Sequence, residues 1–140
     1  MEVPTEQLLL IVVGAHLRAE IEDRPVAYTL RDRMTALLSS SDADPLLPVV
    51  CSDVWYLNQQ GLQQRPVISV GGPSVNALSA YLFPRLATAL QVDQRLAVQM
   101  DIEHGDMRVN LWGADAAQTA AAVEVFEKKY LGGYIRAAMS

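Results

Sequence analysis

Two stretches of the sequence decide the fold: LLLIVVG at residues 8–14 and VISVGG at residues 67–72. Each is a short, almost uninterrupted apolar run that ends at glycine. Such runs are typical of parallel strands covered on both faces, because neither face then needs polar side chains. We therefore predict that the two runs form adjacent, central, parallel strands of one sheet.

Helix and strand signals alternate around and between these two runs. Asp23 and the proline two residues later predict the start of a helix, and residues 48–51 predict a second strand. A short helix is expected from Asp53. A further helix is predicted to open at Pro73 and to carry a stripe of leucines as far as Leu90, kinked or split by a proline at position 84.

The C-terminal third predicts a fourth strand at residues 96–102, parallel to the first three, then a hairpin turn and an edge strand at 107–112. Asp115 predicts the cap of the last helix. We therefore expect one α/β domain over residues 1–140. Its predicted fold is three-layer α/β/α and Rossmann-like (flavodoxin-like), with a mostly parallel five-stranded sheet and one antiparallel edge strand.

The composition argues against two classes of partner. The net charge is −5, and the 11 Lys and Arg residues are scattered. Nucleic-acid binders usually show a basic stripe, and an acidic surface is repelled by anionic membranes. We therefore expect neither nucleic acid nor membrane as a partner.

Self-association is expected from the low charge content and the placement of the aromatic residues. Charged residues make up 19% of the chain, against about 25% in typical globular proteins. Trp55 and Trp112 lie in a short element and on the polar side of a strand, and aromatic side chains are enriched in contact cores. A homo-oligomer is therefore predicted, with plain packing of these residues as the alternative.

A cytoplasmic location is expected, because the longest apolar run, residues 8–15, is far shorter than the ~20 residues that span a bilayer. Glu2 and Glu6 precede this run, where a signal peptide carries positive charge. Cys51 is the only cysteine, so no intrachain disulfide can form. It is interpreted as a small buried residue, with a nucleophile as the alternative.

The sharpest local signal for function is VGGPSVN at residues 70–76, which joins a strand to a helix. Here Gly71 and Gly72 would let a ligand approach the backbone, the helix start would favour an anion, and Ser74 and Asn76 would add hydrogen bonds. The alternative is a tight turn with Ser74 as an ordinary cap. Residues 67–76 resemble a Val-Gly-Gly-Pro-x-Val-Asn stretch of archaeal surface-layer proteins, and no function is inferred from so short a resemblance.

His16 and Arg18 follow the first strand and would face the glycine turn, because ligands of open α/β sheets bind beyond neighbouring strand ends. The sequence thus predicts a binding domain for a small, polar, anionic, nucleotide-like molecule. One alternative is a hydrolase or glycosyl-transfer enzyme, with Glu20 or Asp53 as nucleophile or base and His16 as acid. The other is a non-catalytic assembly module. No cofactor is identified, and no metal site is predicted, since residues 101–106 are interpreted as a solvated turn.

Overall fold

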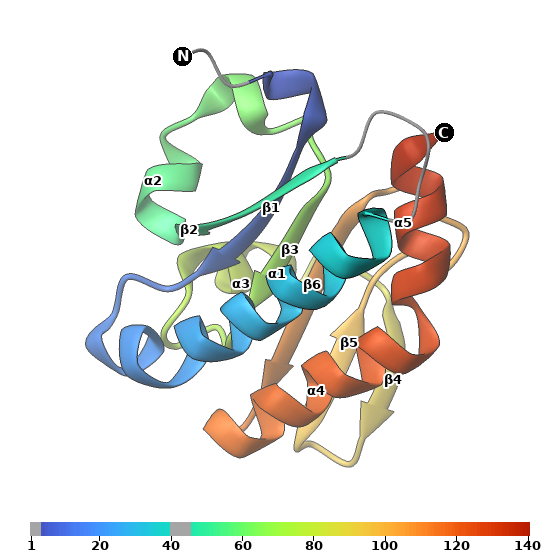
Figure 1. Ribbon diagram of the computed structural model, residues 1–140. Helices are drawn as coiled ribbons and strands as arrows, with labels where there is room; N and C mark the ends of the chain where they lie inside the picture. The colour runs from blue at the N-terminus through green and yellow to red at the C-terminus, as the bar shows by residue number, and fades with distance from the viewer. Residues whose placement is uncertain (1–3, 40–45) are drawn as a thin grey trace.

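The computed structural model describes residues 4–39 and 46–140, and it contains a six-stranded sheet with the order β2-β1-β3-β6-β5-β4 (Figure 1). The neighbours β2, β1, β3 and β6 run parallel, whereas β5 is antiparallel to both β6 and β4. The strands are β1 (Leu8–Val13), β2 (Leu47–Ser52), β3 (Val67–Val70), β4 (Thr88–Val92), β5 (Leu96–Gln99) and β6 (Arg108–Gly113).

Helices cover both faces of this sheet, which confirms the predicted three-layer α/β/α, Rossmann-like class. On one face α1, α4 and α5 enclose the larger core, and on the other α2 and α3 enclose a smaller one (Figure 1). The helices are α1 (Arg24–Leu38), α2 (Asp53–Leu57), α3 (Ala77–Leu82), α4 (Ala116–Lys129) and α5 (Leu131–Met139).

The prediction for the two apolar runs is confirmed: β1 and β3 are adjacent, parallel and interior to the sheet. Ile11 lies opposite Ile68, and every residue of both strands is buried. Burying such a side chain contributes about 1.5–3 kcal/mol, so this pair of strands forms the centre of the fold.

The helix predicted from Pro73 to Leu90 starts later than expected and stops just before Pro84, where a kink or split was predicted. Asn76 caps α3, so this helix begins only at Ala77. It ends at Leu82, because Pro84 follows closely and has no N–H to continue the helix. The leucine spacing continues by coincidence into β4, where Leu90 packs against the core from a strand.

The predicted strand number and directions also need correction. The sheet has six strands rather than five, and the predicted fourth strand is β5, which runs antiparallel to β6. The predicted edge strand is β6, which is interior and parallel to β3. The reason lies in Asn110, whose polar side chain is fully buried and bonded to Gln99 instead of facing water.

The start of α4 matches the sequence prediction, because the Asp115 side chain accepts a hydrogen bond of 2.8 Å from the N–H of Gln118. The segment between β1 and α1 is only partly a loop. Its second half, Ala19–Asp23, is a wide, π-helical turn that continues directly into α1. The carboxylate of Asp23 therefore makes no cap hydrogen bond at the start of α1.

Candidate functional site

The carboxyl ends of β1, β3 and β6 lie side by side and form the floor of a candidate site. The three strands are parallel neighbours, so the chain leaves each of them at the same edge of the sheet (Figure 1). Ligands of open α/β sheets bind in the crevice outside these ends. Here the walls are the loop at 71–76, the segment that leads into α1 and the start of α4.

Two glycines at these strand ends are required by the fold itself. A Cβ at Gly14 would overlap the carbonyl group of Val75, so the loop after β3 could not cross the end of β1. Gly71 has a φ of 118°, and a Cβ there would lie 2.6 Å from Oδ2 of Asp23. Gly72 differs, because its Cβ would meet only the carbonyl oxygen of Gly113 at 3.5 Å, an ordinary contact.

Asn76, a predicted ligand contact, uses its whole side chain to hold the fold together. Its Nδ2 donates to the carbonyl oxygens of Val12 and Val70, at the ends of β1 and β3, and to the hydroxyl of Ser69. Its Oδ1 accepts from the first N–H groups of α3. These bonds leave no polar atom of Asn76 for a ligand, and we assign it to the structure.

Asp53, a candidate base, is also fully engaged with the backbone. One carboxylate oxygen accepts from the N–H groups of Ala15 and Val54, and the other accepts from that of Ala77. The side chain is buried, and it joins the loops after β1, β2 and β3. A carboxylate whose two oxygens both accept backbone hydrogen bonds is a clamp between loops.

The remaining catalytic candidates from the sequence lie on the exposed rim. His16 is exposed, and its Nδ1 accepts a 3.1 Å hydrogen bond from the N–H of Arg18. Glu20 forms a bidentate ion pair with Arg24 at 2.8 and 3.0 Å. Neither His16 nor Glu20 lines the hollow at the centre of the crevice. The approach of His16 to a bound ligand therefore stays a prediction.

The only cysteine is poorly suited to act as a nucleophile. Burial raises the pKa of Cys51 to about 11, so its thiol stays protonated near neutral pH. The interpretation of Cys51 as a small residue in the packing agrees with its contacts to the smaller core.

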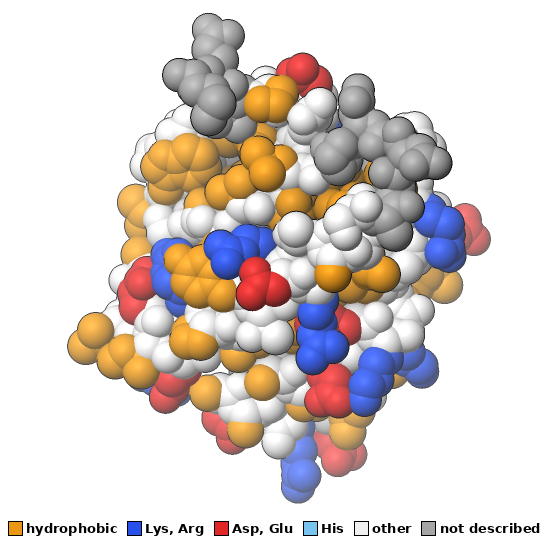
Figure 2. All heavy atoms as spheres, in the orientation of Figure 1, with side chains coloured by type: hydrophobic (Ala, Val, Ile, Leu, Met, Phe, Trp, Pro, Cys, Tyr) orange, Lys and Arg blue, Asp and Glu red, His pale blue; other side chains and the backbone are white. Residues whose placement is uncertain are grey.

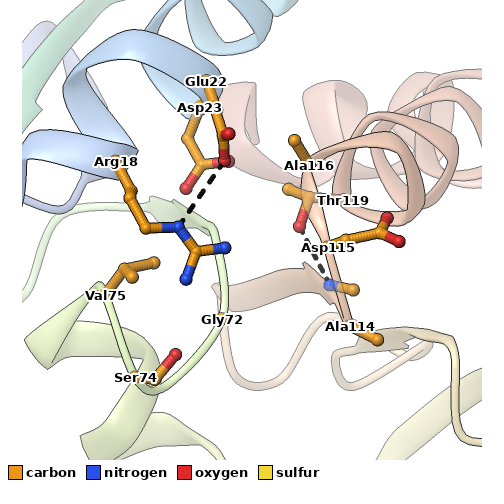
Figure 3. A pocket seen from close by; sticks show the side chains of 11 residues that line it. Arg18, Glu22, Asp23, Gly72, Ser74, Val75, Ala114, Asp115, Ala116 and Thr119 are labelled. Carbon is orange, nitrogen blue, oxygen red and sulfur yellow. Dashed lines mark hydrogen bonds and ion pairs between the residues drawn. The ribbon is translucent and has the colours of Figure 1, made fainter.

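A small hollow lies at the centre of the crevice, between the three walls (Figure 3). Its volume is about 30 Å³, roughly the share of one water molecule in the liquid. The hollow is therefore small, and a bound ligand would extend from it into the open crevice. The side chains that line the hollow include Arg18, Glu22, Asp23, Ser74 and Thr119, whereas the carboxylate of Asp115 points away from it and caps α4 (Figure 3).

Asp23 is the functional candidate that the sequence did not reveal, because it was interpreted only as a helix cap. Its side chain is 5% exposed and lines the hollow, and no described residue donates a hydrogen bond to it. Burial, and to a smaller extent the nearby charge of Glu22, raises the pKa of Asp23 to about 6, although the charge of Arg18 acts to lower it. The carboxyl group thus titrates close to neutral pH.

Arg18, a predicted ligand contact, lies on the same wall as Glu22 and Asp23, and its guanidinium points into the hollow (Figure 3). Its Nε lies 4.0 Å from Oε2 of Glu22, and both side chains are largely exposed. An exposed ion pair of this length contributes little to stability, so Arg18 is available to a ligand. On the opposite wall, the N–H groups of Gly72 and Ser74 have no hydrogen-bond partner among the described residues.

The arrangement offers no ready metal centre. Among residues 4–39 and 46–140, no group of three or more His, Cys, Asp and Glu side chains is placed to hold a metal ion. Asp101, in the acidic turn, instead accepts hydrogen bonds from the N–H groups of Glu103, Gly105 and Asp106. These backbone bonds lower the pKa of Asp101 and close the turn between β5 and β6.

Comparisons with known proteins give no information about the candidate site, so its function is inferred from its geometry alone. In the described part of the chain, no helix has the length and apolar character needed to cross a membrane. Neither a protein-family model nor a curated protein sequence matches this chain.

Proposed function

We propose that this chain binds a small, polar, nucleotide-like ligand at the crevice between Arg18, Asp23 and Gly72. One observation carries the proposal: Asp23 is only 5% exposed, its carboxyl group faces the hollow, and no described residue donates a hydrogen bond to it. Its carboxyl oxygens keep some contact with solvent, so a ligand can reach them from the crevice. A carboxyl group in a cleft whose pKa is raised by burial is typical of functional sites.

The donors around the hollow favour an anionic group on the ligand. Arg18 offers a guanidinium, Gly72 and Ser74 offer N–H groups, and the start of α4 adds its partial positive charge. Glu22 and Asp115 oppose an anion at the same place. An anion is therefore accommodated best when Asp23 is protonated and donates a hydrogen bond to it. Because of the size of the hollow, we expect a single phosphate oxygen to enter.

Adenosine 5′-monophosphate (AMP) is expected to bind more tightly near pH 5.5 than near pH 7.5. If binding requires a proton on Asp23, whose pKa is about 6, the affinity falls toward tenfold per pH unit above that value. A phosphate monoester itself gains negative charge near pH 6, so attraction to Arg18 alone would give the opposite trend. Calorimetric titration across this range measures the slope, and an affinity that rises with pH would contradict the role of Asp23.

Gly72→Leu should strongly weaken AMP binding and leave the protein folded. A Cβ at this position makes only an ordinary contact with Gly113, and the rest of the side chain would fill the hollow. Gly61→Leu is the matched control, because a Cβ at Gly61 meets no atom within 4 Å. Unchanged AMP affinity in a folded Gly72→Leu protein would show that the glycines serve only the turn.

A hydrolase or glycosyl-transfer enzyme acting on a nucleotide-like substrate is the second candidate, and the pKa of Asp23 favours it. A carboxyl group that titrates near pH 6 suits general acid–base catalysis. Asp23 would then take the role that the sequence suggested for Glu20 or Asp53. The test is chromatography of AMP after long incubation with the wild-type protein and with Asp23→Asn. Cleavage that disappears in the variant would support the enzyme, and intact AMP in both would oppose it.

We also propose that the chain forms a homo-oligomer through the β2 edge of the sheet and α2. Leu47, Val54, Trp55 and Leu57 are each 41–57% exposed there, and Figure 2 shows hydrophobic side chains gathered over this corner. Trp55→Glu is expected to shift the sedimenting species from dimer to monomer at micromolar concentration. Val92→Glu, at a similar exposure of 46% in β4, should leave the dimer intact, and a monomeric wild type would refute the proposal.

A further inference from the structure

A second, larger hollow lies on the sheet face opposite α1 and α4. Helices α2 and α3 cover β1 and β3 on that face, and the hollow lies beside them over β4, β5 and β6. Its volume is about 450 Å³, within the range of small-molecule sites. The residues whose side chains define it are Phe83, Thr88, Gln91, Gln94, Gln99 and Trp112.

Trp112 is held in a fixed orientation at one side of this hollow. Its Nε1 donates to Oε1 of Gln99 at 3.0 Å, and Asn110 donates to the same oxygen at 3.0 Å. Gln99 in turn donates to the carbonyl oxygens of Phe83 and Leu86. Burying amide groups is costly unless they are hydrogen-bonded. Here the buried Gln99 amide is hydrogen-bonded through both its oxygen and its nitrogen and holds one partly exposed indole, whereas Oδ1 of buried Asn110 has no partner among the described residues.

The surroundings of the indole are aromatic and uncharged. The Phe83 ring stands edge-on to Trp112 with a centroid distance of 5.4 Å. No Asp, Glu, Lys or Arg side chain is among the described residues that line the hollow. Exposed Gln91 and Gln94 each carry an amide that both donates and accepts. This chemistry suits an uncharged, flat molecule with hydrogen-bonding groups along its edge.

We propose that this hollow binds a purine base, which stacks on Trp112 and hydrogen-bonds to Gln91 or Gln94. A glutamine amide pairs in bidentate fashion with the N6 and N7 edge of adenine, and stacking on an aromatic side chain contributes about 1–3 kcal/mol per base. Trp112 lines this hollow, and Gly113, the next residue of β6, lines the crevice. To that extent the inference rests on the proposed function, whose ligand would place its phosphate in the crevice and its base here.

The test uses adenosine, which lacks the phosphate, and a Trp55→Phe protein in which Trp112 is the only tryptophan. Titration with adenosine is expected to quench the Trp112 fluorescence in a saturable way, with excitation at the red edge where adenosine does not absorb. Gln91→Ala combined with Gln94→Ala should weaken this binding at least tenfold. Both glutamines are exposed, so the double variant is expected to fold.

Further arms separate this inference from the proposed function. Gly72→Leu should leave adenosine binding unchanged, because the leucine fills only the crevice. Methyl glucoside should give no response, and an equal response to it would overturn the assignment to a base. No saturable quenching up to about 10 mM adenosine would overturn this inference even if AMP binds. If adenosine binds but Gly72→Leu does not change the affinity for AMP, the proposed phosphate site in the crevice is refuted, whereas the proposed base site in this hollow is supported.

Discussion

Asn76→Ala is expected to lower the free energy of unfolding by about 3 kcal/mol. The truncation removes the cap of α3, which is worth about 1 kcal/mol. It also leaves the carbonyl oxygens of Val12 and Val70 without their bonds to Nδ2 in a buried place, at about 1 kcal/mol each. Urea denaturation at neutral pH measures the loss, and a change below about 1 kcal/mol would show that the clamp carries little of the stability.

Two further variants divide this effect between its causes. Asn76→Asp keeps an oxygen to cap α3 but removes the donor to the strand ends, so it should be at least as destabilising as alanine at neutral pH. Asn58→Ala is the matched control, because Asn58 is exposed and donates only to the carbonyl oxygen of Val54. Its expected effect stays within about 0.5 kcal/mol.

The centre of the fold could be predicted from sequence because burial on both faces leaves a plain signature. The runs at residues 8–13 and 67–70 contain one polar side chain between them, Ser69, and both were placed correctly as neighbouring parallel strands. The cap of α4 could also be predicted from the sequence, because an Asp with a Gln three residues later is a local signal that depends on no distant contact.

The second half of the sheet was misjudged because tertiary contacts override local pattern there. Asn110 made β6 look half-exposed, and only its distant partner Gln99 lets it be buried in the interior of the sheet. The segment Thr88–Val92 continued a leucine spacing of four from the preceding helix, so its strand pairing with β5 was hidden. Neither partner is visible from the spacing of nearby residues.

The candidate site was also predicted correctly only where local sequence determines the structure. The sequence placed the meeting point of the strand ends correctly, but it could not separate glycines and polar groups that build the loop from those left free. Asn76 looked like a ligand contact and is a clamp. Asp23 looked like a cap, but the wide helical turn before α1 removes the need for one and leaves the carboxyl group at the hollow.

Asp23→Asn is expected to stabilise the protein by up to about 3 kcal/mol at pH 8 and to change its stability little near pH 4. The pKa of Asp23 is raised from 3.8 to about 6 in the fold, so the folded state holds the proton more tightly than the unfolded state. The wild type therefore loses stability as pH rises from about 4 through 6, at about 1.4 kcal/mol per unit of pKa difference. Asparagine has no proton to lose, so the variant escapes this loss. Urea denaturation at three pH values measures the difference.

The pH dependence distinguishes a buried, titrating carboxyl group from a simple packing effect. Asp32→Asn is the control, because the Asp32 side chain is 70% exposed and its replacement should change stability by less than about 0.5 kcal/mol at every pH. A gain in Asp23→Asn that is equal at pH 4 and pH 8 would contradict the raised pKa. The same variant should lose the pH dependence of AMP binding, because the proton taken up with the ligand resides on Asp23. If Asp23→Asn is more stable but AMP binding keeps its pH dependence, Asp23 does not contact the ligand. If the variant is more stable and the pH dependence of AMP binding disappears, the protein gives up stability at Asp23 in order to bind the ligand, as is common at functional sites.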